Sequence, residues 1–123
     1  MNHADVFKAL GEQSRLRIMK LLLKTGKEAC GCELVDSLLI PQYNLTKHID
    51  ILMHAGLITS RKEGRWVYYS ACQQSPFCET VCEAIQGVKD PIYEEDLVRF
   101  KKRLSLREGD KCLLGIQNKK LSG

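Results

Sequence analysis

The amino-acid sequence predicts a mainly α-helical fold with one β-hairpin, its elements following in the order α-α-α-α-β-β-α-α. Apolar residues recur at helical spacing up to about residue 56 and again after residue 76, and between these stretches the apolar period shortens to two. The chain has 123 residues, of which 44% are hydrophobic and 28% charged, as in one ordinary soluble domain. We therefore expect one domain over residues 1–107 and a C-terminal tail over residues 108–123.

We expect four helices before the hairpin. The first closes at Gly11, and the second covers residues 13–24 and ends at Gly26, since glycine commonly terminates helices. The third stops at Pro41, which is well suited to open the fourth, and the fourth ends at Gly56. The apolar stripes of these helices are, in order, Val6, Phe7 and Leu10; Leu16, Met19, Leu22 and Leu23; Leu34, Val35, Leu38 and Leu39; and Leu45, Ile49, Leu52 and Met53.

Two short strands are predicted next, at Leu57–Arg61 and Arg65–Ser70, because both are rich in β-branched and aromatic residues. The charged turn Lys62-Glu63-Gly64 joins them. Helical spacing returns over Phe77–Ile85 and in a last helix from about Ile92 to Leu106. A basic run near that end, for which a solvated face is the usual explanation, consists of Lys101, Lys102, Arg103 and Arg107.

Two short helices joined by a tight connection, followed by a hairpin with a charged tip, form a winged helix-turn-helix arrangement. The fourth helix and the wing carry amide, hydroxyl, aromatic and cationic side chains, which suit base edges and phosphates. The candidate DNA-binding residues are Gln42, Tyr43, Asn44, Thr46, Lys47 and His48 on the helix and Arg61, Lys62 and Arg65 on the wing. The net charge of +4 permits an anionic partner without requiring one. A merely solvated helix face and a protein-interaction module stay open as alternatives.

The runs LGEQSRLRIMKLLL (10–23), ELVDSLLIPQYNLTKHIDILMHAGLI (33–58) and RKEGRWVYYS (61–70) are similar to the ArsR/SmtB family of metal-responsive winged-helix repressors. The resemblance covers about the first 85 residues. It departs from the family pattern at Glu12-Gln13, where Asp-Pro is usual, and at Pro41, where Ser is usual. It implies a homodimeric transcriptional repressor of double-stranded operator DNA, paired through the first helix and the helix at 77–86. The interface residues that it implies are Phe7, Leu10, Phe77, Val81 and Ile85.

The cysteine content is high for the compartment that the sequence indicates. No apolar stretch approaches the roughly 20 residues of a membrane span, and Met1–Val6 lacks the apolar region of a signal peptide. We therefore expect a cytoplasmic protein with no membrane partner. A reducing compartment disfavours structural disulfides, so the six cysteines indicate metal binding, thiol chemistry or simple burial.

Cys30-Gly31-Cys32, directly before Glu33-Leu34, resembles the C-x-C-[DE]-L box with which the arsenic and cadmium/lead sensors of the family bind their inducer. A helix N-terminus lowers the pKa of a thiol, which favours the thiolate that a soft ion needs. Residues two apart on a helix point roughly 200° away from each other, so we expect ion binding to distort the helix start, with Gly31 easing the distortion. The resemblance implies As(III) or Sb(III) as inducer, followed by Cd(II) or Pb(II).

The other four cysteines include candidates for a third ligand, because Val35 stands where arsenic sensors of this type often carry another Cys. Cys112 in the tail is the first candidate and Cys72, just past the wing, is the second; a two-coordinate site is the remaining option. Cys78 and Cys82 are four residues apart and share a helix face, which is compatible with metal chelation. They also lie on the apolar stripe of that helix, which favours core packing.

These patterns predict a repressor that releases its operator when a thiophilic ion, As(III) first, binds Cys30 and Cys32. Two alternatives stay open, namely a redox sensor whose cysteines form disulfides and a winged-helix protein-interaction module without DNA binding. No enzymatic activity is expected, because the sequence offers no Ser/His/Asp constellation, Gly-rich phosphate loop or paired carboxylates.

Overall fold

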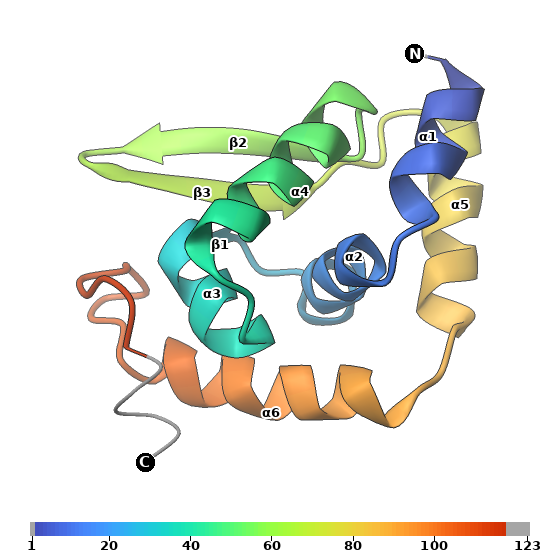
Figure 1. Ribbon diagram of the computed structural model, residues 1–123. Helices are drawn as coiled ribbons and strands as arrows, with labels where there is room; N and C mark the ends of the chain where they lie inside the picture. The colour runs from blue at the N-terminus through green and yellow to red at the C-terminus, as the bar shows by residue number, and fades with distance from the viewer. Residues whose placement is uncertain (1, 118–123) are drawn as a thin grey trace.

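The computed structural model describes residues 2–117 and contains six helices and three strands in that range. It confirms the predicted winged helix-turn-helix order and adds one short strand that the sequence did not predict, β1 (Figure 1). The elements are α1 (His3–Leu10), α2 (Gln13–Thr25), β1 (Ala29–Cys30), α3 (Gly31–Leu38), α4 (Gln42–His54), β2 (Ile58–Glu63), β3 (Trp66–Ala71), α5 (Pro76–Gly87) and α6 (Pro91–Leu104).

Helix boundaries follow from capping residues. The Glu12 carboxylate accepts the Arg15 N–H at 3.1 Å and so caps α2, which makes the absence of the family's usual Asp-Pro at this point harmless. Gly26 ends α2 in the left-handed conformation, with φ of 65°. Ser75 and Asp90 cap α5 and α6, each followed by a proline that opens the helix.

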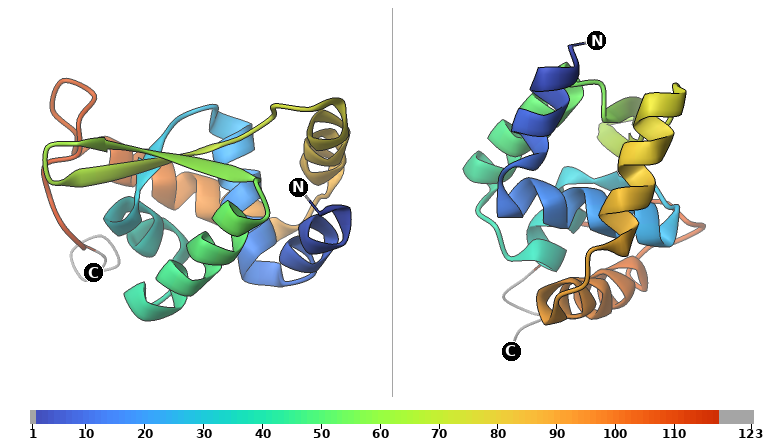
Figure 2. Two further views of the ribbon diagram at one scale, coloured as in Figure 1. Left: turned by 90° about the horizontal axis from the view of Figure 1, so that it is seen from above. Right: turned by 90° about the vertical axis from the view of Figure 1, so that its right-hand side faces the viewer.

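The sheet has the strand order β1-β3-β2, and both pairings are antiparallel. The hairpin turns at Gly64-Arg65 rather than at residues 62–64, with Gly64 at φ of 62°, and it extends away from the helices as a wing (Figure 2). β1 pairs with the middle of β3, so that Cys30 lies opposite Tyr68. The wing is therefore joined through the sheet to the start of α3.

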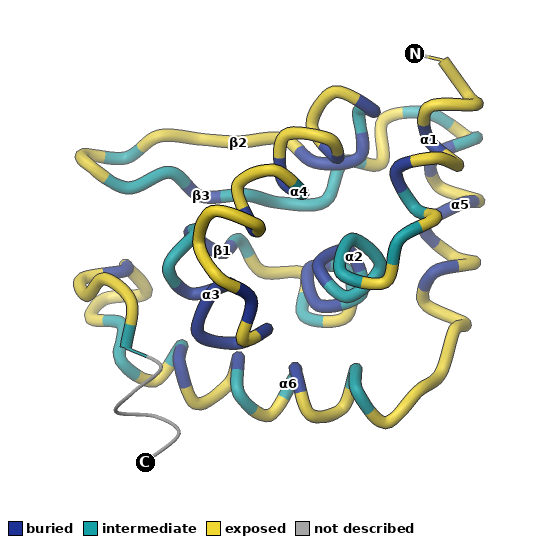
Figure 3. Tube along the Cα trace, in the orientation of Figure 1, coloured by how far each residue is buried: buried dark blue, intermediate teal, exposed yellow. Residues whose placement is uncertain are grey.

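The core surrounds α2, which contacts the other five helices (Figure 1). Along each helix the buried residues face inward and the exposed ones outward, as Figure 3 shows. α6 runs along one side of α3, so α3 lies between α6 and the DNA-side helix α4. Fully buried members of the core include Ile18, Met19, Leu22, Leu34, Leu52 and Phe100.

The segment after α6 turns back toward α3. Glu108 and Lys111 bond each other through their backbones, and residues 108–117 then lie against α3, α6 and β3. Residues 118–123, the remainder of the expected tail, lie outside the described part of the chain. None of the helices within residues 2–117 is both long and apolar enough to cross a membrane.

Candidate metal centre and nucleic-acid interface

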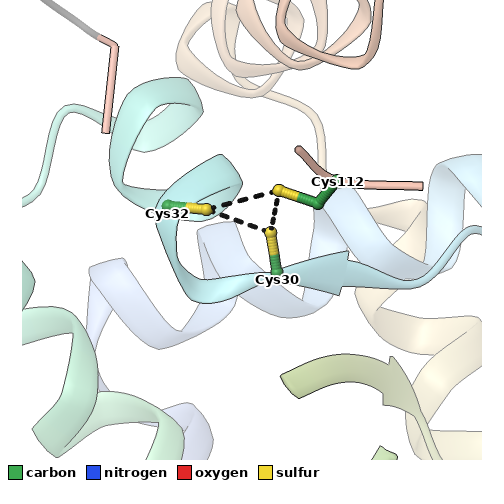
Figure 4. A group of neighbouring side chains, drawn as sticks. All are labelled: Cys30, Cys32 and Cys112. Carbon is green, nitrogen blue, oxygen red and sulfur yellow. Dashed lines mark hydrogen bonds between the residues drawn. The ribbon is translucent and has the colours of Figure 1, made fainter. Parts of the chain in front are cut away.

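Three cysteine sulfurs meet at the start of α3, in a group that we call the thiol triad: Cys30, Cys32 and Cys112 (Figure 4). The Sγ atoms lie 3.1 Å apart for Cys30–Cys32, 2.9 Å for Cys30–Cys112 and 3.5 Å for Cys32–Cys112. Among residues 2–117 it is the one group of three or more potential ligands whose atoms all lie within 4.8 Å of one another. Cys72, the alternative third ligand, does not belong to it.

The premise that both cysteines lie within the helix is wrong, because Cys30 is not helical. It is the N-cap of α3, with φ of −84° and ψ of 164°, and it belongs to β1. Cys32 lies inside the first helical turn. An extended residue followed by a helical one turns both sulfurs to the same side, so the two thiols are already adjacent without any unwinding.

Hydrogen bonds from distant parts of the chain hold the triad. The Cys30 N–H donates to the Glu33 carboxylate at 3.0 Å. Arg107 binds both oxygens of that carboxylate at 2.7 Å. The Cys112 N–H donates to the Tyr68 hydroxyl at 2.8 Å. Cys30 and Cys112 are therefore each positioned by a buried backbone hydrogen bond and not by contacts between the sulfurs alone.

A buried ion pair, Arg103 with Asp36, seats the segment that carries Cys112. Arg103 Nε lies 2.6 Å from the Asp36 carboxylate, and both side chains are at most 1% exposed. Arg103 Nη2 donates to the carbonyls of Leu114 and Gly115 at 2.6 and 2.9 Å and lies 3.8 Å from Cys32 Sγ. The Asp36 carboxylate accepts the N–H of Gln117 at 2.8 Å.

The solvated-face interpretation of the basic run is therefore wrong for Arg103 and Arg107. Their side chains are 1% and 6% exposed and are paired with acids on α3, whereas Lys101 and Lys102 are exposed. The sequence does contain a signal for this, since Arg99 and Arg103 are four residues apart and share one face of α6, and Arg107, just past the end of the helix, continues the spacing. Glu33 and Asp36 offer a matching acidic spacing on α3.

The three thiols differ in pKa. Hydrogen bonding to Cys30 lowers the pKa of Cys32 to about 6 against the opposing effect of burial, and Cys112 and the charge of Arg103 act in the same lowering direction. The pKa of Cys30 is raised by its hydrogen bond to Cys32 and by burial. Burial raises the pKa of Cys112. At neutral pH the triad therefore holds one thiolate, at Cys32, beside two thiols.

The remaining cysteines lie away from the triad. Cys78 and Cys82 are completely buried on α5, and burial raises the pKa of Cys82. Cys72 is half-buried just after β3. Their metal-binding role stays a prediction, and their burial is what core packing requires.

The predicted DNA-binding residues of α4 form an exposed surface, with one exception. Gln42, Tyr43 and Asn44 are exposed, as are Thr46 and Lys47. The Lys47 ammonium lies 4.4 Å from the centre of the Tyr43 ring, which keeps a cation and an aromatic ring together on this face.

His48 is half-buried and faces α2 rather than open solvent. Its Nδ1 lies 3.1 Å from the Arg15 guanidinium, whose Nε donates to the Ala9 carbonyl. Glu12 lies 3.9 Å from the same ring nitrogen. Helix packing is thus the role that these contacts assign to His48, and base contact by this residue stays a prediction.

The three wing cations differ in their surroundings. Arg61 is paired with Glu28 and contacts Glu63, and hydrogen bonding to Arg61 lowers the pKa of Glu28. Lys62 is exposed, and Arg65 is exposed beside Trp66, with its guanidinium 5.0 Å from the ring centre. Lys62 and Arg65 are therefore ready for an anionic partner, whereas Arg61 must first leave a carboxylate.

The residues implied for a dimer interface are only partly available. Phe7 is 61% exposed and packs edge-on against Phe77, with ring centres 5.8 Å apart. Leu10 and Phe77 are half-buried, whereas Val81 and Ile85 belong to the core of the single chain. A partner would therefore find most of its apolar area at Phe7 and Phe77.

Comparisons with known proteins agree with this architecture. Residues 12–60 match the model of the family described as "Bacterial regulatory protein, arsR family". An uncharacterized HTH-type transcriptional regulator of Methanocaldococcus jannaschii is 44% identical over 66 residues, which are 54% of this chain and 73% of that protein. The arsenic resistance transcriptional regulator ArsR1 of Pseudomonas putida is 35% identical over 85 residues, which are 69% of this chain but 64% of the relative, less than two thirds of its length.

Solved structures give the same result for the fold. HlyU from Vibrio cholerae superposes with a TM-score of 0.60 at 29% identity, covering 68% of this chain and 86% of that chain. These relatives are transcriptional regulators and not enzymes, as the sequence led us to expect. The fold, the match to the family model and the 44% identity to a relative of which the chain covers 73% lead to the same conclusion. The protein belongs to the ArsR family of winged-helix transcriptional regulators.

Proposed function

We propose that this chain is a homodimeric, DNA-binding repressor that releases its operator when As(III) or a similar thiophilic ion binds Cys30, Cys32 and Cys112. The observation that carries the proposal is the thiol triad, whose three sulfurs converge within one chain. Soft thiolate ligands select thiophilic ions over Mg²⁺ or Ca²⁺. Because sensing needs free thiols, we propose that the protein works in the reducing cytoplasm.

The spacing of the sulfurs supports a pyramidal ion. With metal–sulfur bonds of about 2.3 Å, tetrahedral angles place sulfurs about 3.8 Å apart, and angles near 90° place them about 3.3 Å apart. The triad separations of 2.9, 3.1 and 3.5 Å match the smaller angle. As(III) and Sb(III), which carry a lone pair opposite their three ligands, fit this arrangement better than a tetrahedral Zn(II).

The charges around the triad support a trivalent ion. The buried groups beside it are Arg103 with Asp36 and Arg107 with Glu33, which cancel. As(III) or Sb(III) bound by three thiolates is neutral, whereas Cd(II) or Pb(II) leaves one negative charge. Because an uncompensated buried charge is costly, the neutral complex is favoured, and As(III) and Sb(III) come first.

The connection from site to DNA is short. α3 begins at the triad and ends at Leu38, three residues before Pro41, the N-cap of the exposed helix α4. A coupling free energy of about 1–3 kcal/mol between the two sites would weaken operator binding roughly 5- to 150-fold. In a dimer both α4 helices bind together, so a modest change in each protomer alters the affinity for a palindromic site.

The experiment measures binding to a labelled duplex selected by the protein from random sequences, followed by fluorescence anisotropy with and without arsenite. We expect the natural protein to lose affinity in arsenite, and the variants Cys30→Ser, Cys32→Ser and Cys112→Ser to lose that response. Cys72→Ser, a half-buried cysteine outside the triad, serves as the matched control and should respond normally. Release of DNA by arsenite from the Cys30 or Cys32 variant would refute the site.

A second function, oxidation sensing, is favoured by one observation: Cys32 has a pKa of about 6 and lies beside two other thiols. A thiolate with a neighbouring thiol is oxidised readily to a disulfide, with peroxide as the oxidant. This function predicts release of DNA by peroxide and recovery by a thiol reductant. Ion sensing predicts release under fully reducing conditions with one ion per chain.

A further inference from the structure

A row of three residues crosses the sheet from the wing to the thiol triad. Arg61 on β2 lies opposite Tyr68 on β3, and Tyr68 lies opposite Cys30 on β1. Directly opposed residues in antiparallel strands place their side chains on the same face. A cation of the wing and a cysteine of the triad are therefore separated by a single aromatic side chain.

Arg61 is not free in this arrangement. Its Nε lies 3.0 Å from Glu28 Oε2 and its Nη2 lies 2.8 Å from Glu28 Oε1, so the carboxylate holds the guanidinium at two points. The guanidinium also lies over the Tyr68 ring, 4.9 Å from its centre. Both side chains of the ion pair keep contact with solvent, Arg61 at 48% and Glu28 at 36% exposure, so an outside anion can reach Arg61.

Both neighbours of Arg61 are tied to the triad. Glu28 stands two residues before Cys30, and its backbone carbonyl accepts a hydrogen bond of 2.8 Å from Arg107. Arg107 also holds Glu33, the acceptor of the Cys30 N–H. On the other side the Tyr68 hydroxyl accepts the N–H of Cys112 at 2.8 Å.

From this geometry we infer that Glu28 competes with DNA for Arg61, and that an ion bound at the triad strengthens the hold of Glu28. The inference rests on the proposed function and adds a residue and a route to it. A phosphate can bind Arg61 only by displacing a carboxylate of the same chain. Glu28 thus acts as an internal substitute for the DNA backbone.

The direction of the ion effect follows from the same contacts. An ion that bonds Cys30 and Cys112 fixes both of their backbones. Because the Cys112 N–H donates to the Tyr68 hydroxyl, fixing Cys112 also orders Tyr68. Because Cys30 bonds Glu33, and Arg107 bonds both Glu33 and the Glu28 carbonyl, fixing Cys30 also orders Glu28. A more ordered pair opposes displacement of Glu28 by phosphate, so ion binding weakens DNA binding, and by linkage DNA weakens ion binding equally.

The test compares Glu28→Gln with the natural protein in the anisotropy assay, in the absence and presence of arsenite. Glu95→Gln is the matched control, because it removes one exposed carboxylate of the same kind from α6, away from the wing. The variant Arg61→Gln and the double variant show whether any effect of residue 28 depends on Arg61. Breaking one surface ion pair leaves the fold intact, which circular dichroism checks.

We expect Glu28→Gln to bind the duplex roughly two- to fivefold more tightly than Glu95→Gln, the range in which a surface ion pair contributes. The gain should vanish in the Arg61→Gln background. The ratio of affinities without and with arsenite should be smaller for Glu28→Gln than for the natural protein.

Three results would overturn parts of this account separately. If the natural protein binds no duplex, the proposed function itself fails. If it binds but Glu28→Gln and Glu95→Gln have equal affinity, competition for Arg61 is refuted. A third result is that Glu28→Gln binds DNA more tightly, but arsenite lowers its affinity by the same factor as for the natural protein. The competition for Arg61 then holds, and the route from the triad to the wing is refuted.

Discussion

The affinities of the thiol triad for arsenous acid and for Cd(II) should change with pH in opposite directions. Above a pH of about 6 the free site carries one thiolate, because the pKa of Cys32 is lowered to about 6 while those of Cys30 and Cys112 are raised. The number of protons that binding releases or takes up therefore depends on the protonation of the free site and on the form in which each ion arrives.

The two balances give the size of the effect. Arsenous acid, As(OH)₃, reacts with one thiolate, two thiols and one proton to form three As–S bonds and three waters. Because one proton is taken up, its apparent affinity falls about tenfold per pH unit between pH 6 and the ordinary thiol range near 8.5. Cd(II) reacts with one thiolate and two thiols and releases two protons, so its apparent affinity rises about a hundredfold per pH unit.

The assay is a titration of the reduced protein at several pH values, followed by the ultraviolet charge-transfer absorption of the metal–sulfur bonds. Cys72→Ser leaves the triad intact and should show both slopes. An arsenous acid affinity that stays constant over this range would show that the free triad holds no thiolate, and the assignment of the low pKa to Cys32 would be refuted. A Cd(II) slope of one proton would exclude one of the two thiols from the ligand set.

Three other predictions concern stability and DNA binding. Asp36→Asn leaves the charge of Arg103 buried without its partner and should lower the free energy of unfolding by about 3–5 kcal/mol in urea denaturation. Gly31→Ala should stabilise the ion-free protein by about 0.4–1 kcal/mol and keep arsenite binding, since an added Cβ meets nothing within 4 Å. Gly26→Ala should destabilise the protein by about 1–2 kcal/mol, because φ at this residue is +65°. Thermal unfolding of both variants tests the contrast. Lys62→Ala should weaken DNA binding for all sequences alike and reduce the slope of log affinity against log salt by about 0.9 per wing.

Much of the fold can be predicted from local sequence signals. The order of six helices and one hairpin follows from apolar spacing, and the ends follow from residues such as Gly26 and Pro41. These signals are local because capping and turn formation depend on a few neighbouring residues. β1 escapes them, since a two-residue strand has no period and exists only because β3 offers it a partner.

The candidate site shows the same limit. The Cys30–Cys32 motif is visible in the sequence, but the side to which the sulfurs point depends on the extended conformation of Cys30, which the pairing with Tyr68 imposes. Cys112 could be named as a candidate third ligand, but only the seating of residues 114–117 on Arg103 and Asp36 brings it to the other sulfurs. The spacing of Arg99 and Arg103 indicates a shared helix face, but it does not show that Asp36, 67 residues away, is the partner.

The bracing of α3 restricts how an ion can act on DNA. Arginines bond this helix from its first turn to its last residue, and the pairs are Arg107 with Glu33, Arg103 with Asp36, Arg99 with the Ser37 carbonyl and Arg17 with the Leu38 carbonyl. Asp96, itself 1% exposed, ties Arg17 to Arg99. A helix held at four points does not unwind when an ion binds at its start. Ion binding can therefore affect DNA binding by a rigid displacement of α3 together with α4, or through the sheet to the wing. Only the second route depends on Glu28.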